Sequence, residues 1–203
     1  MEIIHYFAPI SGYAYLGIAA LMEMAAKQGC SIVHAPVDIQ AVFAASSVTP
    51  PAAQSAAKKK YRAADMKRWA ARRSLPVNLQ PKYWPANGVL AARYIIAAGE
   101  LSGERGPMAQ AVLEATWARD LDIANEDTMQ LLSRELGLDA NAMKEVASSA
   151  QTTGIAQQHT DDAIALGLFG SPTYLFADEM FFGQDRLDFL EQDIVKRKAM
   201  AMA

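Results

Sequence analysis

FAPISGYAYLG, residues 7–17, joins a short β-branched run to a segment whose apolar side chains recur at helical spacing. Residues 3–22 carry no formal charge. Pro9 and Gly12 would nevertheless interrupt either the apolar region of a signal peptide or a membrane helix. Ser11 is a residue type favoured as a helix N-cap. We therefore interpret the segment as a strand–turn–helix corner of a globular domain.

The corner belongs to a larger βαβ unit. Residues 2–7 are expected to form a strand, and the following helix should end near Gly29, a residue suited to the position after a helix. Residues 31–37 are expected to form the next strand. Two strands joined by one helix should be parallel, with a right-handed crossover.

The middle of the chain changes character, because residues 51–168 are rich in helix-forming residues and lack alternating segments. Residues 75–85 contain three prolines and are expected to form a loop, as is the uncharged run 39–57. The expected helices are 53–73, 88–98, 108–120, 127–136, 140–150 and 151–166.

The chain ends with two short strands, 173–176 and 180–182, around a tight turn, and a last helix capped by Asp185. The predicted fold is α/β, a frame of βαβ plus C-terminal ββα that encloses a large all-helical insertion. We predict one domain from residues 1–48 and 168–203, and a helical insertion domain from residues 49–167.

Composition narrows the class of protein. Of 203 residues, 52% are hydrophobic and 20% charged, with a net charge of −3, which is ordinary for a globular protein. We expect a soluble, cytoplasmic protein with no nucleic-acid or membrane partner and no metal site. Cys30 is the only cysteine, so an internal disulfide and a two-cysteine redox centre are both excluded. We interpret Cys30 as a buried structural thiol.

Three loops could hold a ligand, and each has a plainer interpretation. Ser11 lies where a strand ends and a helix begins, a usual anion-binding position, but it could be only an N-cap. Ser171-Pro172 precedes a strand, where a cis proline would present the backbone N–H and C=O of Ser171. Gln184 and Asp185 begin the last helix, where they could bind an α-amino acid group or simply cap the helix. A basic run from Lys58 to Arg73 could form a solvated helix face or steer an anion.

These features occur together in one family. The sequence resembles the glutathione-dependent 2-hydroxychromene-2-carboxylate isomerases, which are similar to kappa-class glutathione transferases and belong to the DsbA-like branch of the thioredoxin superfamily. The resemblance covers essentially the whole chain and implies a thioredoxin-like fold. Its motifs are F-x-x-x-S-x-Y-x-Y-L at 7–16, K-x-x-Y-x-x-x-D-x-x-R-W-A at 58–70, L-P at 75–76, W-P-A-N at 84–87, and F-G-S-P-T with E-M-F-F-G-Q-D-R-L between 169 and 187.

The resemblance implies how glutathione would bind. Ser11 would donate a hydrogen bond to the glutathione thiolate, and Ser171, before Pro172, would pair through its backbone with the cysteinyl unit. Lys58 would reach the glycyl carboxylate. The γ-glutamyl end of glutathione would meet Gln184 and Asp185. Ser47 lies where the family often has an asparagine near the active site.

The resemblance also implies an activity: conversion of 2-hydroxychromene-2-carboxylate to trans-o-hydroxybenzylidenepyruvate in aromatic-hydrocarbon breakdown. Thiolate addition would make the double bond single, and rotation and elimination would follow. Tyr83, Trp84 and Asn87 are candidate walls for the flat substrate, and a homodimer is expected. Two alternatives remain, a kappa-like transferase or peroxidase acting on electrophiles, and a non-catalytic DsbA-like binding domain.

Overall fold

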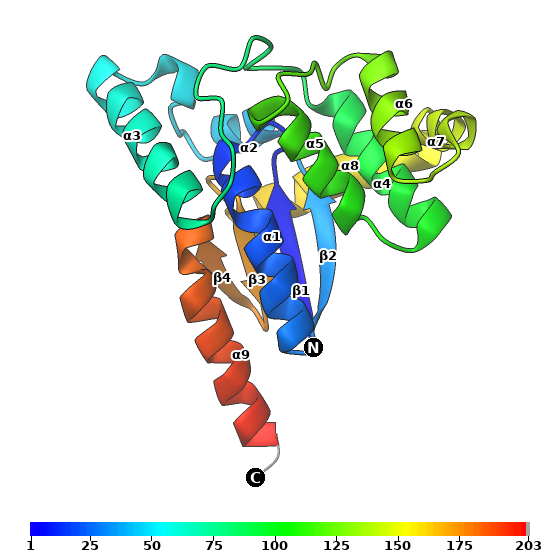
Figure 1. Ribbon diagram of the computed structural model, residues 1–203. Coiled ribbons are helices and arrows are strands. Elements are labelled where there is room, and N and C mark those ends of the chain that lie inside the picture. Colours follow the sequence, from blue (N-terminus) through cyan, green and yellow to red (C-terminus); the bar gives the residue numbers. More distant parts are fainter. Residues whose placement is uncertain (202–203) are drawn as a thin grey trace.

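A four-stranded mixed sheet lies at the centre of the computed structural model, which describes residues 1–201 (Figure 1). The strand order is β2-β1-β3-β4. β1 is parallel to β2 and antiparallel to β3, and β3 is antiparallel to β4. The predicted βαβ unit and C-terminal hairpin are therefore confirmed. The strands are β1 (Glu2–Phe7), β2 (Ser31–Pro36), β3 (Thr173–Phe176) and β4 (Glu179–Phe182).

Alternation along β1 sends side chains to two different helical layers. Ile3 packs in one cluster with Leu21 of α1 (Gly12–Lys27) and with residues of α9 (Leu187–Ala201). Tyr6 packs in another cluster with Ala163 of α8 (Ala150–Ala165). Since successive residues of a strand face opposite sides, both faces of the sheet are covered, giving an α/β/α arrangement.

The insertion between β2 and β3 is helical, as predicted. Its capped helices begin where serine, asparagine or aspartate accepts hydrogen bonds from the first-turn N–H groups, as Ser55, Asn125, Asp139 and Ser149 do. These elements are α2 (Ile39–Ala45), the 3-10 turn η1 (Pro51–Ala53), α3 (Ala56–Arg72), α4 (Val89–Ser102), α5 (Gly106–Trp117), α6 (Glu126–Glu135), α7 (Ala140–Ala147) and α8.

The expectation of a loop over residues 39–57 was wrong in part, since α2 and η1 lie there. Asp38 caps α2 by accepting a hydrogen bond from Gln40 N–H at 2.9 Å, and Val42 is buried. α2 packs against α8, more than 100 residues further along the chain. Because this short helix is stabilised by tertiary packing, its own periodicity is a weak signal.

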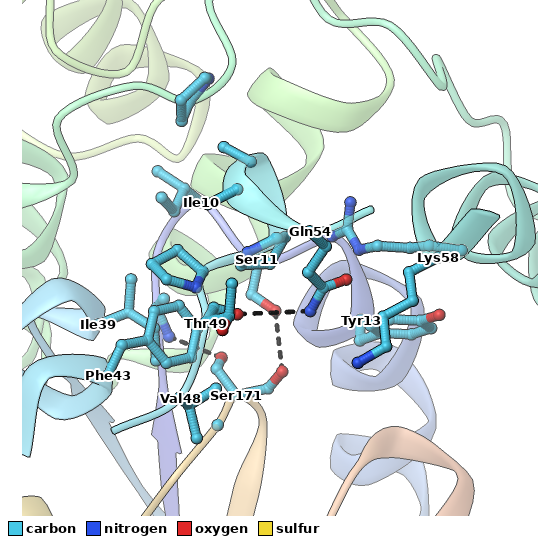
Figure 2. A pocket seen from close by; sticks show the side chains of 18 of the residues that line it. Ile10, Ser11, Tyr13, Ile39, Phe43, Val48, Thr49, Gln54, Lys58 and Ser171 are labelled. Carbon is cyan, nitrogen blue, oxygen red and sulfur yellow. Dashed lines mark hydrogen bonds between the residues drawn. The ribbon is translucent and has the colours of Figure 1, made fainter. Parts of the chain in front are cut away.

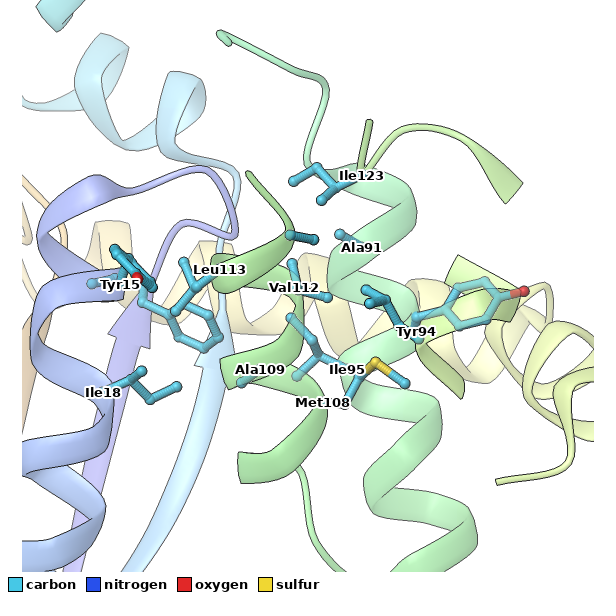
Figure 3. Packing of buried hydrophobic residues seen from close by; sticks show 14 of the residues in the cluster. Tyr15, Ile18, Ala91, Tyr94, Ile95, Met108, Ala109, Val112, Leu113 and Ile123 are labelled. Carbon is cyan, nitrogen blue, oxygen red and sulfur yellow. The ribbon is translucent and has the colours of Figure 1, made fainter. Parts of the chain in front are cut away.

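The largest cluster of buried side chains joins the sheet's first helix to the insertion. Tyr15 and Ile18 of α1 face Leu113 of α5, and Ile95 of α4 belongs to the same cluster (Figure 3). The helical segment thus shares its hydrophobic core with the sheet-bearing frame. The division into two domains at residues 48/49 and 167/168 remains a prediction.

Two details of the C-terminal and first crossover segments differ from expectation. Asp185 does not cap the last helix directly, because it lies inside the 3-10 turn η2 (Gln184–Arg186), which precedes α9. Cys30 is half-buried rather than buried. None of the helices among residues 1–201 is long and apolar enough to cross a membrane.

Candidate active site

Ser11 lies at the N-terminus of α1, where the chain leaves β1. Its side-chain oxygen accepts a hydrogen bond from Ala14 N–H at 3.2 Å, so it does cap the helix. Its hydroxyl donates to the backbone oxygen of Ser171, also at 3.2 Å. The Ser11 oxygen therefore accepts as a helix cap does. Its hydroxyl proton can be donated either to the Ser171 oxygen or to a ligand. The positive end of the α1 dipole favours an anion at this point.

Ser171 faces Ser11 across the sheet edge although 160 residues separate them. The Ser171 Oγ accepts from Ala8 N–H at 2.8 Å, which ties the start of β3 to the end of β1. The Ser171–Pro172 peptide bond is cis. Pro172 is buried, and its carbonyl accepts from Gly183 N–H at 2.9 Å.

A cavity of about 740 Å³ opens between this corner, the α2–η1 segment and α3. In Figure 2, Ser11, Ser171 and Lys58 lie around the same space, with Ile10, Ile39, Phe43 and Val48 along its apolar side. Among the described residues, those that line the cavity include Lys58 and Arg62 but no aspartate or glutamate. The cavity therefore suits an anionic ligand that also has an apolar part.

Aromatic residues contact both the turn that carries Ser11 and Arg62, the second cation of the cavity. The indole N–H groups of Trp84 and Trp117 both donate to the backbone oxygen of Ile10, each at 3.2 Å. The Arg62 guanidinium lies over the rings of Trp84, Trp117 and Tyr13, at 5.3, 5.7 and 5.5 Å from their centroids. Burial lowers the pKa of the Arg62 guanidinium from its usual value. A phenol, two indoles and a guanidinium thus support the turn that carries Ser11.

The predicted residues do not all reach this cavity. Ser11, Lys58, Trp84 and Ser171 line it. Ser47 is exposed just after α2 in a left-handed conformation (φ 56°), and the following residues line the cavity instead.

Two candidate walls from the proline-rich loop also lie outside. Tyr83 is exposed, with Lys82 Nζ 4.9 Å from its ring centroid. Asn87 accepts a hydrogen bond from Val89 N–H and lines a separate cavity of about 440 Å³. Of the three predicted wall residues, only Trp84 faces the space beside Ser11.

Gln184 and Asp185 line a different cavity, of about 320 Å³, near the C-terminal end of α3, whereas Lys58 lies in the first turn of that helix. Gln184 is only 2% exposed, and its side-chain oxygen accepts from the Arg73 guanidinium at 2.6 Å. Asp185 is exposed and forms an ion pair with Arg186 at 3.1 Å. Of the two, only Asp185 keeps a side chain that solvent can reach.

Sequence reasoning missed several residues that line the main cavity, among them Tyr13, Phe43 and Arg62. Phe43 lies in α2, which was expected to be a loop, and Arg62 was one of eight similar cations in the basic run. Tyr13 occurs in the motif at residues 7–16, which by itself assigns it no role. Its hydroxyl donates to Asp65 at 2.9 Å, and burial together with that bond raises its pKa. The helical spacing of Arg62 four residues after Lys58 places both on one face and was a usable signal.

The sheet order, the βαβ and ββα halves, the serine at the first helix N-terminus and the cis proline before β3 together define a thioredoxin-like fold of the DsbA type. The chain belongs to the family of DSBA-like thioredoxin domains, whose model matches residues 2–195.

Named relatives lie within this family. The chain is 32% identical to a 2-hydroxychromene-2-carboxylate isomerase of Sphingobium xenophagum, over 92% of this chain and 94% of that protein. It is 29% identical to a 2-hydroxychromene-2-carboxylate isomerase of Pseudomonas sp. (strain C18), over 93% and 88%. A solved structure of such an isomerase superposes over the full length of both chains with a TM-score of 0.82 at 26% identity. These relatives are isomerases.

Proposed function

We propose that this protein is a glutathione-dependent isomerase that interconverts 2-hydroxychromene-2-carboxylate and trans-o-hydroxybenzylidenepyruvate. The observation that carries the proposal is the Ser11 hydroxyl, held at a helix N-terminus beside the Ser171 backbone, in a cavity that no aspartate or glutamate of residues 1–201 lines. The relatives named for this isomerisation match nearly the whole chain, which supports the same substrate class.

The residues around the cavity fit glutathione. Ser11 can donate to a thiolate, and the Ser171 backbone lies beside it. Lys58 lines the same cavity and can pair with the glycyl carboxylate. Gln184 and Asp185 lie outside this cavity, in the separate one near the C-terminal end of α3. The γ-glutamyl end would therefore extend out of the main cavity toward Asp185, whose exposed carboxylate suits an ammonium better than Gln184, which already binds Arg73.

When bound, glutathione supplies a thiolate that adds to a conjugated carbon, so that the former double bond can rotate before the thiolate leaves. The protein's task is to favour that thiolate, because a free thiol has a pKa near 8.5 and is mostly protonated at neutral pH. The Ser11 hydroxyl can turn from the Ser171 oxygen toward an anion, while Ala14 N–H keeps its oxygen in place. Each tenfold gain in rate needs about 1.4 kcal/mol of such stabilisation.

The apolar side of the cavity serves the organic substrate. Ile10, Ile39, Phe43 and Val48 line it together with the Trp84 indole. A flat aromatic carboxylate can pack against these groups and displace water from the reacting carbon atoms.

Ser11→Ala is the direct test. We expect the variant to bind glutathione with a higher thiol pKa, measured by ultraviolet absorbance of the thiolate, and to lose about 100-fold in turnover, the scale of one oxyanion-type donor. Turnover is followed from the ultraviolet spectrum of the chromene carboxylate with and without glutathione. Total free thiol should stay constant through many turnovers, whereas a transferase would consume it.

Ser149→Ala is the matched control, because Ser149 caps α8 by accepting from Thr152 N–H and does not line the cavity. It should lose cap stability and keep turnover. If Ser11→Ala kept both the lowered thiol pKa and full turnover, Ser11 would be only a helix cap and the thiolate role would be rejected.

A further inference from the structure

Arg62 is half-buried, and the reaction proposed above assigns no role to its guanidinium. It enters the main cavity from α3, one helical turn after Lys58. Among residues 1–201, no carboxylate oxygen lies within 4.0 Å of its nitrogen atoms. The carboxylate nearest along its own helix, Asp65, instead accepts from the Tyr13 hydroxyl.

The three aromatic rings around Arg62 contribute attraction but no hydrogen-bond acceptor. They lie 5.3–5.7 Å from the guanidinium carbon, within the range of cation–π contacts. A guanidinium has five N–H donors in a planar fork, and a partly desolvated charge is costly unless it is paired. The nitrogen atoms of Arg62 are not among the buried polar atoms that lack a hydrogen-bond partner. The guanidinium is therefore accessible from the cavity that Arg62 lines.

We propose that Arg62 binds the carboxylate of the organic substrate and so makes the enzyme specific for planar aromatic carboxylates. This rests on the proposed function, and it adds which residue selects the substrate's charge. A carboxylate matches the guanidinium fork in two parallel hydrogen bonds, while the attached ring system can extend along Phe43 and Ile39. Lys58 remains for the carboxylate of glutathione, so that each cation of the cavity has one anionic partner.

A purely structural role gives different results. If Arg62 only clamped Tyr13, Trp84 and Trp117 together, its loss would weaken charged and neutral ligands equally. If it is the carboxylate anchor, only ligands with a carboxylate are affected.

The test compares equilibrium binding of cinnamate and cinnamide, which share an aromatic ring and differ in charge. It uses calorimetry on the full chain with glutathione present. For wild type, cinnamate should bind about tenfold or more tightly than cinnamide, and added salt should reduce that preference. Arg62→Met should lose the preference and keep the cinnamide affinity, and Arg62→Lys should retain part of it. Arg68→Met removes an exposed cation of the same helix and should change neither ligand.

The outcomes separate this proposal from the proposed function. Equal wild-type affinities for the two ligands would overturn the anchor without any variant. So would a chromene-carboxylate KM unchanged in a folded Arg62→Met protein that still turns over. Selective loss of cinnamate binding in a protein with no isomerase activity would keep the anchor and reject the isomerase function.

Discussion

The three histidines of the chain lie in one group, in which His5 and His34 are buried and His159 is half-buried. Their surroundings predict that acid destabilises the fold above the pH at which most carboxylates titrate. His5 and His34 are 0% and 4% exposed, and their Nδ1 atoms are 3.0 Å apart. The Arg105 guanidinium donates to the His34 backbone oxygen and lies 3.3 Å from His159 Nε2. A proton added at His159 Nε2 costs the contact with Arg105, because a protonated nitrogen can no longer accept. A proton added to the His5–His34 pair creates a charge in buried surroundings.

The physical causes lower the histidine pKa values in the folded state. Burial and the neighbouring Arg105 charge lower the pKa of His34 from 6.5 to about 4. For His159, burial first and Arg105 second lower the pKa to about 4, although a backbone bond at Pro36 and the Asp162 charge oppose them. Burial and His34 also lower the pKa of His5 well below its usual value.

The sign follows from proton uptake. Below pH 6.5 the unfolded chain binds protons that the folded chain refuses until about pH 4, so the free energy of unfolding falls as the pH falls through this window. One pKa unit corresponds to about 1.4 kcal/mol, so each of His34 and His159 removes ~2 kcal/mol between pH 7 and pH 5. The two together predict a loss of at least about 4 kcal/mol, and the lowered pKa of His5 adds to it in the same direction. Such a loss is a large part of the stability of a typical domain.

The assay is urea unfolding followed by far-ultraviolet circular dichroism at pH 7 and pH 5. His159→Gln keeps an acceptor for Arg105 but cannot take up a proton, so its loss between the two pH values should be about 2 kcal/mol smaller than that of wild type. The reasoning is refuted if wild type loses less than about 1 kcal/mol, or if His159→Gln depends on pH as steeply as wild type does.

Two further predictions concern the packing that supports the site. A Cβ atom at Gly17 would lie 2.7 Å from the Gln184 Cβ, so Gly17→Ala should lower the free energy of unfolding by about 1–3 kcal/mol in urea titrations. Gly154 has open space around it, so Gly154→Ala should instead raise the free energy of unfolding. Equal effects of the two substitutions would contradict the close approach at Gly17. Tyr15→Phe removes the hydroxyl that donates to the Pro76 oxygen at 2.5 Å and should cost about 1 kcal/mol in the same measurement, and an unchanged midpoint would show that the bond contributes nothing.

The local parts of the architecture could be predicted because their signals are local. Ser11 lies directly before a helix whose N–H group it accepts from, so residue type and position were sufficient. The Ala177-Asp178 turn joins two strands in tight register, with positive φ at both residues, and its hairpin was predicted from the flanking apolar runs.

A site residue could be predicted only where the helix or strand next to it in the sequence determines its position. Ser11 and Ser171 each begin or precede a regular element, and the sheet order then brings those ends together. Gln184 has an equally clear place in the chain, yet it binds Arg73 from another helix and turns away from the main cavity.

By itself, the sequence determined the order of the strands and of the helices other than α2, the N-cap of the first helix and the absence of an internal disulfide, because these depend on neighbouring residues or on composition. The tertiary structure alone decided that Arg62, out of eight similar cations, enters a cage of three rings, since Tyr13, Trp84 and Trp117 come from three distant segments. It also decided that α2 is a helix and that the three histidines meet. Long-range packing sets these features, and no spacing along the chain records which distant side chains will lie within a few ångströms of one another.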